Sequence, residues 1–316
     1  MTIGLADVQR ARPVIAGHIL RTPLVSSHSL GERVGAEAFL KLENLQRTGS
    51  FKVRGAVYAM SRLSPAARAA GVVTMSAGNA AQAIAYAGRA QGVRVTVVMP
   101  ETAPKTKIAA TRGYGGEIRF AAEMTALLPM VQALQAQGLH FLHPFDDEDV
   151  IAGHASLGHE IIEDLDGVDL VVVPVGGGGL ISGVALAVKA LRPGARIVGV
   201  EPEGAQAVRR GLDAGRSVRL DALSTVADGL AAPFAGERNL AIIRRDVDDV
   251  VAIPDEAILE GLRFLVSRAR IVAEPAGAAA VGALLSGAVR PRAGERVVAI
   301  VSGGNVDPDR LAGFLA

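Results

Sequence analysis

The stretch that decides the fold reads Val171-Val172-Val173-Pro174-Val175-Gly176-Gly177-Gly178-Gly179-Leu180-Ile181-Ser182-Gly183. Its β-branched start predicts a strand, its glycines a turn, and the apolar pattern from Val184 to Leu191 a helix. Glycines let consecutive backbone N–H groups converge on one anion, and the positive end of the following helix strengthens its binding. We therefore expect a phosphate at this loop. A flexible linker is the alternative, but the apolar runs on both sides argue against a free tether.

A second informative stretch holds one of only five lysines among the 33 basic residues: Thr48-Gly49-Ser50-Phe51-Lys52-Val53-Arg54-Gly55. Lys52 lies between an aromatic and an apolar residue, so it can be partly desolvated. Desolvation lowers the pKa of the amine and keeps it nucleophilic toward an aldehyde, as a Schiff base requires. The alternative is an ordinary lysine at the start of a helix, with Ser50 as its N-cap.

Two Gly-Asn motifs follow strand-like runs. Ser76-Ala77-Gly78-Asn79-Ala80-Ala81-Gln82 comes after the run 71–75 and presents hydroxyl, amide and free N–H groups at a helix start, which suits a carboxylate. Ser302-Gly303-Gly304-Asn305 places a hydroxyl at the carboxyl end of the run 297–301, where open α/β sheets bind ligands. Either motif alone could be turn chemistry.

These four motifs, in this order, resemble those of the threonine/serine dehydratase and serine racemase family, pyridoxal-phosphate enzymes of the tryptophan-synthase β fold. The similarity covers nearly the whole chain, beginning at Arg21-Thr22-Pro23-Leu24 and Lys41-Leu42-Glu43-Asn44-Leu45-Gln46. It implies an α/β, two-lobed fold type II enzyme with parallel-rich open sheets covered by helices. A large cofactor-binding domain of residues 1–68 and 144–316 would enclose a small inserted domain of residues 69–143. We expect no regulatory domain after Ala316.

The same resemblance implies the roles of individual residues. Lys52 would carry pyridoxal phosphate in a Schiff base, Phe51 would lie against the pyridine ring, Asn79 would meet the ring hydroxyl and Ser302 would face the pyridine nitrogen. The phosphate would be held by the backbone amides of Gly176, Gly177, Gly178, Gly179 and Leu180. The substrate carboxylate would be bound by Ser76, Ala77, Gly78, Asn79 and Gln82.

Composition narrows the functional classes. Of the 316 residues, 50% are hydrophobic, and the mean hydropathy of +0.33 is ample for a large core. A net charge of +1 with 3% aromatic residues argues against a nucleic-acid partner. The absence of cysteine fits a cytoplasmic protein, and the first seven residues lack the pattern of a signal peptide. Pro174 and the four glycines divide the uncharged stretch 170–188 into a strand and a helix, so we expect no membrane span.

Alternating strand-like and helix-like segments predict parallel sheets covered by helices. Strand-like runs lie at 38–40, 93–99, 117–120, 196–200 and 250–253, and helical patterns at 80–91, 124–135, 255–272 and 277–285. No composition shift marks a domain boundary. A homodimer is left open as the assembly state.

Three departures from the family pattern bear on substrate and reaction. Ala77 stands where serine racemases have a serine that acts as acid and base opposite the lysine, so dehydration is favoured over racemization. Ala80 replaces the usual histidine and opens space beside the substrate carboxylate. His154 stands where the family commonly has glutamine, and we expect a structural role for it.

We expect no specific metal site. The racemase-like branch binds Mg²⁺ or Ca²⁺ through a glutamate, a carbonyl and an aspartate, and the matching positions here are Glu201, Ala205 and Ala207, so one carboxylate is missing. The spacing of His140 and His143 puts them on opposite faces of a strand, which argues against a transition metal.

The leading hypothesis is a pyridoxal-phosphate-dependent ammonia-lyase that converts L-threonine or L-serine to a 2-oxo acid and ammonia by β-elimination. The neutral hydroxyl of Ser302 would favour elimination, because it cannot keep the pyridine nitrogen protonated. 3-Hydroxyaspartate, phenylserine or another substituted β-hydroxy amino acid remains open as the substrate. A serine racemase, a β-replacement enzyme and an inactive cofactor- or amino-acid-binding protein are the alternatives.

Overall fold

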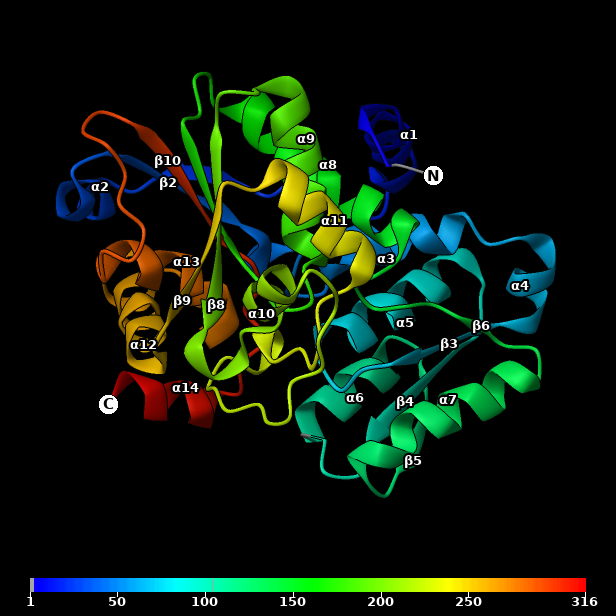
Figure 1. The fold of residues 1–316 in the computed structure, drawn as a ribbon. Coiled ribbons are helices and arrows are strands. Elements are labelled where there is room, and N and C mark those ends of the chain that lie inside the picture. Colours follow the sequence, from blue (N-terminus) through cyan, green and yellow to red (C-terminus); the bar gives the residue numbers. More distant parts are fainter. Residues whose placement is uncertain (1–2, 104) are drawn as a thin grey trace.

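The computed structural model describes residues 3–103 and 105–316 and contains two sheets (Figure 1). The large sheet has the order β1-β2-β10-β7-β8-β9, and the small sheet has the order β5-β4-β3-β6. All neighbouring strands are parallel except β1 and β2. The large sheet consists of β1 (Leu24–Ser26), β2 (Glu37–Leu42), β7 (Leu170–Pro174), β8 (Arg196–Pro202), β9 (Asp249–Ile253) and β10 (Arg296–Val301). The small sheet consists of β3 (Val72–Met75), β4 (Val95–Pro100), β5 (Glu117–Ala121) and β6 (His140–Phe141).

Helices connect these strands and cover both sheets (Figure 1). In the first half they are α1 (Leu5–Ile15), α2 (His28–Val34), α3 (Lys52–Ser61), α4 (Pro65–Ala70), α5 (Asn79–Gln91), α6 (Lys105–Gly113) and α7 (Leu127–Ala136). In the second half they are α8 (Glu148–Asp164), α9 (Gly179–Leu191), α10 (Ala207–Ala214), α11 (Glu237–Asp246), α12 (Asp255–Phe264), α13 (Pro275–Leu285) and α14 (Pro308–Leu315). The 3₁₀ turns are η1 (Glu43–Leu45), η2 (Met124–Ala126), η3 (Glu203–Ala205) and η4 (Asp228–Leu230), and η5 (Leu265–Ala269) is a π-helix.

The central strand β7 explains why its sequence is apolar throughout. Leu170 and Val172 pack with α12 and α13 on one face of the large sheet, whereas Val171 and Val173 pack with α8, α9 and α11 on the other. Successive side chains of a strand point to opposite faces, so a strand covered on both sides must be apolar at every position. The predicted parallel α/β fold is therefore confirmed.

The small sheet is likewise covered on both faces. Val72 and Val97 pack against α3 and α5, and Val73 and Val98 pack against α7. All four of its strands lie within residues 72–141, which is compatible with the proposed inserted domain of residues 69–143. We call this sheet with α5, α6 and α7 the small-sheet unit. Helix α3 contacts both α5 of this unit and α8 of the large-sheet part.

Several expected boundaries are wrong, each for a local reason. The strand expected from Val93 begins at Val95, because the N–H of Val93 donates to the carbonyl of Gly88 and completes the end of α5. The helix expected over 255–272 leaves the α-helical pattern after Phe264 and ends at Arg270, whose φ of 63° is left-handed. The helix expected from Met124 begins with a 3₁₀ turn.

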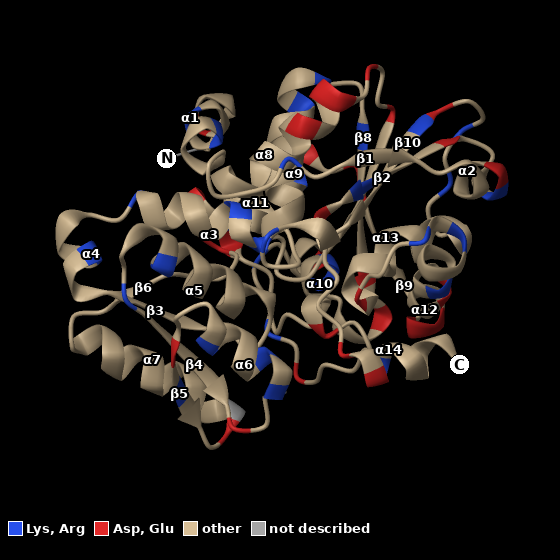
Figure 2. Ribbon diagram, turned by 180° about the vertical axis from the view of Figure 1, so that it is seen from behind, with Lys and Arg blue, Asp and Glu red and all other residues tan. Residues whose placement is uncertain are grey.

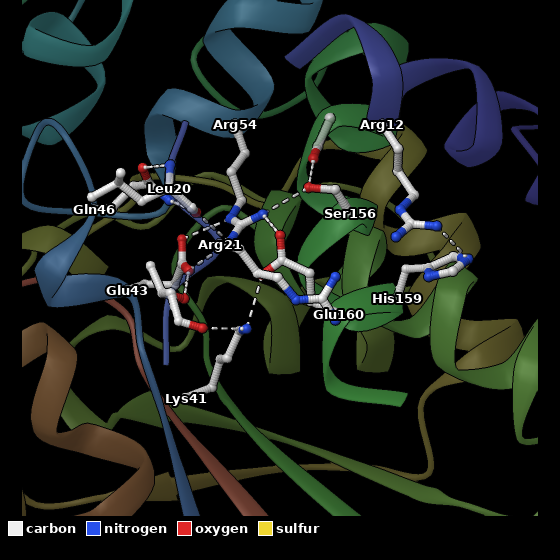
Figure 3. A network of polar contacts seen from close by, with 12 residues as sticks. Arg12, Leu20, Arg21, Lys41, Glu43, Gln46, Arg54, Ser156, His159 and Glu160 are labelled. Carbon is white, nitrogen blue, oxygen red and sulfur yellow. Dashed lines mark hydrogen bonds and ion pairs between the residues drawn. The ribbon is translucent and has the colours of Figure 1, made fainter. Parts of the chain in front are cut away.

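A cluster of buried charges fixes α3 to the large-sheet part (Figure 3). We call Lys41, Glu43, Arg54 and Glu160 the Arg54 cluster. The guanidinium of Arg54 donates to Glu43 at 2.8 Å and to Glu160 at 2.7 Å, and the amine of Lys41 lies 2.8 Å from Glu160. The four charges belong to β2, η1, α3 and α8, and they sum to zero. A buried charge is tolerated when it is paired and hydrogen-bonded, as here.

The surface charges are mixed. Figure 2 shows Lys and Arg interspersed with Asp and Glu over both parts of the molecule. Within residues 3–103 and 105–316, no helix has the length and apolar character needed to cross a membrane.

Candidate active site

A cavity of about 440 Å³ lies between the small-sheet unit and the large-sheet part. Its wall includes Ser76, which follows β3, Val175, which follows β7, and Ser302, which follows β10. Ligands of open parallel sheets bind outside the carboxyl ends of the strands. The cavity thus occupies the position expected for a ligand site and contains three of the four sequence motifs.

The fourth motif supplies the lysine. Lys52 is the first residue of α3 and reaches the cavity, where its amine donates to the carbonyl of Pro144 at 3.4 Å and lies 5.0 Å from the centre of the Phe51 ring. Burial lowers the pKa of Lys52 from 10.5 to about 8, and the carboxyl of Glu274 opposes this shift only partly. A substantial fraction of the amine is therefore uncharged and nucleophilic near pH 8.

Ser50 is not the N-cap of α3, because Phe51 occupies that position. Ser50 instead forms an antiparallel bridge with Gly303, and the N–H of Phe51 donates to the carbonyl of Ser302 at 3.1 Å. The N–H of Gly304 donates to the carbonyl of Gly49 at 2.9 Å. These bonds fix the position of Lys52 relative to Ser302, although the two residues are far apart in the sequence.

The glycine loop forms the floor of the cavity. Gly178 has a φ of 95°, and a Cβ atom on Gly177 would lie 2.4 Å from the ring of Phe145, so these two positions require glycine. The side-chain amide of Asn239 donates to the carbonyls of Gly177 and Phe145 and holds the loop. Among the described residues, no acceptor partners the N–H groups of residues 176–181, which precede and open α9. Such a row of free donors at a helix start is a site for an anion.

The Ser-Ala-Gly-Asn motif lies on the small-sheet side of the cavity. Gly78 is the N-cap of α5, and its N–H donates to the hydroxyl of Ser76 at 3.2 Å. Ala77 and Ala80 line the cavity. Gln82 is buried within α5 and does not line the cavity, unlike the other expected carboxylate ligands.

Asn79 joins the two sides of the cavity. Its side-chain N–H₂ donates to Glu274 at 2.6 Å, and its oxygen accepts from the amide of Asn305 at 2.9 Å. Asn305 also donates to the carbonyl of Thr48. The hydroxyl of Ser302 donates to the carbonyl of Ala276 at 3.4 Å. The structure therefore brings Lys52, the glycine loop, Asn79 and Ser302 around one cavity.

Sequence reasoning missed Glu274, which lines the cavity and is only 3% exposed. Burial raises the pKa of Glu274 to about 7, with a further contribution from Asp228, while the hydrogen bond from Asn79 and the amines of Lys107 and Lys52 oppose the shift. The sequence feature that could have pointed to Glu274 is its position directly before Pro275, at the start of an apolar helix.

An ion pair at the cavity wall was missed as well, and His143 was considered only for metal binding. The amine of Lys107 on α6 binds Asp228 on η4 at 2.5 Å, and both residues line the cavity. His143 also lines it, and burial lowers the pKa of this imidazole to about 4. The Nδ1 atom of His143 accepts the N–H of Asp146, so the ring is neutral at pH 7 and serves to shape the loop.

The residues considered for metal binding have other contacts. The buried carboxylate of Glu201 accepts the N–H groups of Val208 and Arg209 at the start of α10, and burial raises its pKa to about 7. Within the described residues, no group of three or more His, Asp or Glu side chains is arranged to hold a metal ion. His154 is buried and lies edge-on to the Phe51 ring at 4.8 Å.

Comparisons with known proteins identify the family. Residues 15–303 match the family model described as pyridoxal-phosphate dependent enzyme. An L-threonine ammonia-lyase of Thermotoga maritima is 41% identical over 98% of this chain and 77% of its own length. An L-threo-3-hydroxyaspartate ammonia-lyase of a Pseudomonas species is 40% identical over 98% of this chain and 97% of its own. The structure of maize serine racemase superimposes with a TM-score of 0.94 at 34% identity, over 99% of this chain and 97% of the racemase chain.

The chain therefore belongs to the pyridoxal-phosphate-dependent enzymes, and the resemblance inferred from the four motifs is confirmed. Its two-sheet architecture is that of the fold type II members of this group. The cofactor of the family is pyridoxal phosphate, a phosphorylated aldehyde. An aldehyde needs a nucleophilic amine and a phosphate needs an anion site, and the cavity offers both.

Proposed function

We propose that this protein is an ammonia-lyase that converts a β-hydroxy amino acid, L-threonine or L-serine, to a 2-oxo acid and ammonia. The observation that carries the proposal is the half-buried amine of Lys52, placed in one cavity with the glycine loop and Ala77. The similarity to threonine and hydroxyaspartate ammonia-lyases along nearly the whole chain supports the same reaction class.

The residues present fit the cofactor. Lys52 would hold its aldehyde carbon, Phe51 would lie against its ring, and the amides of residues 176–180 would bind its phosphate. Asn79 and Ser302 would contact the ring hydroxyl and nitrogen. The fit rests on the loop amides, which have no acceptor among the described residues, and on Gly177 and Gly178, where a side chain would collide with Phe145 or Asn239. When bound, pyridoxal phosphate supplies the electron sink that acidifies the Cα–H bond of an amino acid.

Lys52 also serves as the base in this proposal. Once the substrate amine has replaced it, the lysine amine removes the α-proton. Its lowered pKa keeps part of the population uncharged and able to accept that proton. The Cβ–O bond would then break, and the leaving hydroxyl would depart as water by taking up a proton, which the now protonated Lys52 amine can return. The released enamine hydrolyses to the 2-oxo acid and ammonia.

Ala77 favours elimination over racemization. Racemization needs a group that returns a proton to the face opposite Lys52, and the methyl of Ala77 cannot do so. Chiral chromatography of serine left during turnover tests this directly. Pyruvate should form much faster than D-serine, and Ala77→Ser should raise the D-serine fraction. Equal rates of pyruvate and D-serine formation in the natural protein would contradict the assignment.

The decisive experiment is a panel of β-hydroxy amino acids, with both β-epimers of each, assayed for 2-oxo acid and ammonia. Threonine and serine should yield both products in equal amounts. A cofactor-loaded protein that releases no ammonia from any member of the panel would refute the proposed reaction. It would favour the cofactor-binding alternative.

We further propose a cytoplasmic homodimer. Two large apolar side chains, Leu45 and Val272, are each about half exposed, at 51% and 52%. They belong to neighbouring segments, because the side chain of Asn44 donates to the carbonyl of Val272. Light scattering of the natural protein and of Leu45→Glu tests the assembly. The mass measured for the natural protein should be twice the chain mass, and the mass measured for the variant should be lower.

A further inference from the structure

Beside Ser76, Asn79 and Lys107, the small-sheet side of the cavity also presents an apolar wall. Met75, Ala80, Val98, Pro100 and Leu127 form this wall. Val98 and Leu127 continue into the hydrophobic cluster beneath α7, so the wall is backed by core. A carboxylate would find no hydrogen-bond donor among these five side chains.

The basic side chains that line the cavity are already engaged, one in the proposed chemistry and one in an ion pair. Among the described lining residues, the only Lys and Arg side chains are those of Lys52 and Lys107. Lys52 is required by the proposed chemistry. Lys107 is paired with Asp228, whose carboxylate also lies 3.6 Å from Arg310 on α14.

We propose that Asp228, by occupying Lys107, makes this site selective for β-hydroxy amino acids with an uncharged β-substituent and excludes 3-hydroxyaspartate. The inference rests on the proposed function and specifies its substrate. A second substrate carboxylate would meet an apolar wall, the carboxylate of Asp228 and the buried Glu274. Removing a carboxylate from water without a partner is costly, so binding of the dicarboxylate is disfavoured.

The same geometry shows how the selectivity can be reversed. In Asp228→Asn the side chain keeps its size, but Lys107 loses its counter-ion and can pair with a β-carboxylate. Lys107 is carried by the small-sheet unit and Asp228 by the large-sheet part, so the pair spans the cavity. A substrate with a neutral β-substituent gains nothing from a freed amine. The kcat/KM for the dicarboxylate should therefore rise relative to that for the neutral substrate.

The test compares kcat/KM for L-threonine and for both epimers of L-3-hydroxyaspartate. The natural holoenzyme should prefer threonine by about 100-fold, because the dicarboxylate leaves one charge unpaired. Asp228→Asn should raise the ratio of 3-hydroxyaspartate to threonine by about tenfold or more. The double variant Asp228→Asn/Lys107→Gln should lose that gain. Asp213→Asn, which makes the same charge change at an exposed residue of α10, should leave the ratio unaltered.

Binding of unreactive analogues gives a second readout. 2-Methylserine and 2-methylaspartate lack the α-proton, and the change in cofactor absorbance reports their dissociation constants. The natural protein should bind 2-methylserine more tightly, and Asp228→Asn should narrow the difference.

Preferential turnover of 3-hydroxyaspartate by the natural protein would overturn the inference while leaving the lyase assignment intact. Persistence of the Asp228→Asn gain without Lys107 would also overturn it. Absence of turnover with every substrate, together with normal discrimination between the analogues, would instead refute the proposed function alone.

Discussion

The Arg54 cluster and the cavity each contain two cations and two anions, but they are organised in opposite ways. In the Arg54 cluster every charge lies within 2.8 Å of an opposite charge. Among the described residues that line the cavity, only Lys107 and Asp228 are paired at contact distance. The charged groups of Lys52 and Glu274 instead contact a carbonyl and an amide.

This difference decides which groups can exchange protons near neutral pH. Arg54 holds the pKa of Glu43 below its usual range, and Glu43 in turn raises the pKa of Arg54, so the cluster remains charged. In the cavity, burial without a close counter-ion brings the pKa of Lys52 down to about 8 and that of Glu274 up to about 7. Paired charges thus hold α3 in place, whereas Lys52 at the start of α3 and Glu274 before α13 lack a close counter-ion and can exchange protons.

The largest effect should come from removing the cavity amine. Lys52→Ala should lower turnover about 10³-fold or more, because we propose that this one group is both the anchor of the cofactor and the base. The variant should still bind pyridoxal phosphate through the loop amides, measured as retained cofactor after gel filtration. Lys105→Ala, an exposed lysine on α6, is the matched control.

Borohydride reduction and peptide mapping of the natural protein locate the anchor. The pyridoxyl group should be found on Lys52. Its recovery on Lys41, Lys105, Lys107 or Lys189 would reject the assignment and remove the contrast between a reactive cavity and an inert cluster.

Breaking the paired cluster should instead affect folding. Arg54→Met leaves Glu43 without its main counter-ion, and Glu160 keeps only Lys41. The expected cost is about 3–5 kcal/mol in the free energy of unfolding. Urea denaturation of the cofactor-free protein measures it. Arg209→Gln, which removes an exposed ion pair with Asp213, should cost less than about 1 kcal/mol. Equal losses in the two variants would show that the buried cluster stabilises no more than a surface pair.

The sequence predicted those parts of the site that are encoded locally. A β-branched run followed by glycines specifies strand β7 and the loop, and Lys52 is recognisable by its flanking residues. The alternation of strands and helices predicted the parallel sheets, since burial on both faces requires apolar strands.

The rest depends on contacts between distant segments. Lys107 and Asp228 are separated by 121 positions, and each alone looks like a surface charge. Ser50 has the character of an N-cap, but its bridge to Gly303 places it in extended backbone. Local preference could not reveal a tertiary pairing that outweighs it. The effect of burial on Glu274 was invisible for the same reason.

The unpaired carboxyl of Glu274 should make stability depend on pH. Its pKa of about 7 in the folded protein exceeds the ordinary value of 4.5, so the folded state binds more protons than the unfolded state between these values. The contribution of Glu274 to the free energy of unfolding is therefore fully present below pH 4.5. It falls by about 3 kcal/mol as the pH rises to 7. Glu274→Gln should remove this dependence.

Thermal unfolding of the cofactor-free protein at intervals from pH 4.5 to 7.5 measures the effect as the difference between natural protein and variant. Glu203→Gln, an exposed residue of η3, is the control and should follow the natural curve. A Glu274→Gln curve parallel to the natural one would mean that this carboxyl is not strained by its burial. The proposed difference between paired and unpaired charges would then not hold for Glu274, the most buried of the cavity charges.

The smallest effect should come from Ala80, an uncharged position on the apolar wall. Ala80 is buried at the second residue of α5 and lines the cavity, so Ala80→His adds volume and a polar ring where no charge is present. We expect kcat/KM to fall only a few-fold for serine and threonine, and about tenfold for phenylserine, because a ring competes with a bulky β-substituent for the same space. An equal loss for all three substrates would show that this wall does not contact the β-substituent. Selectivity would then depend on the charges of Asp228 and Lys107 alone, whereas a graded loss would mean that shape and charge act on the same part of the substrate.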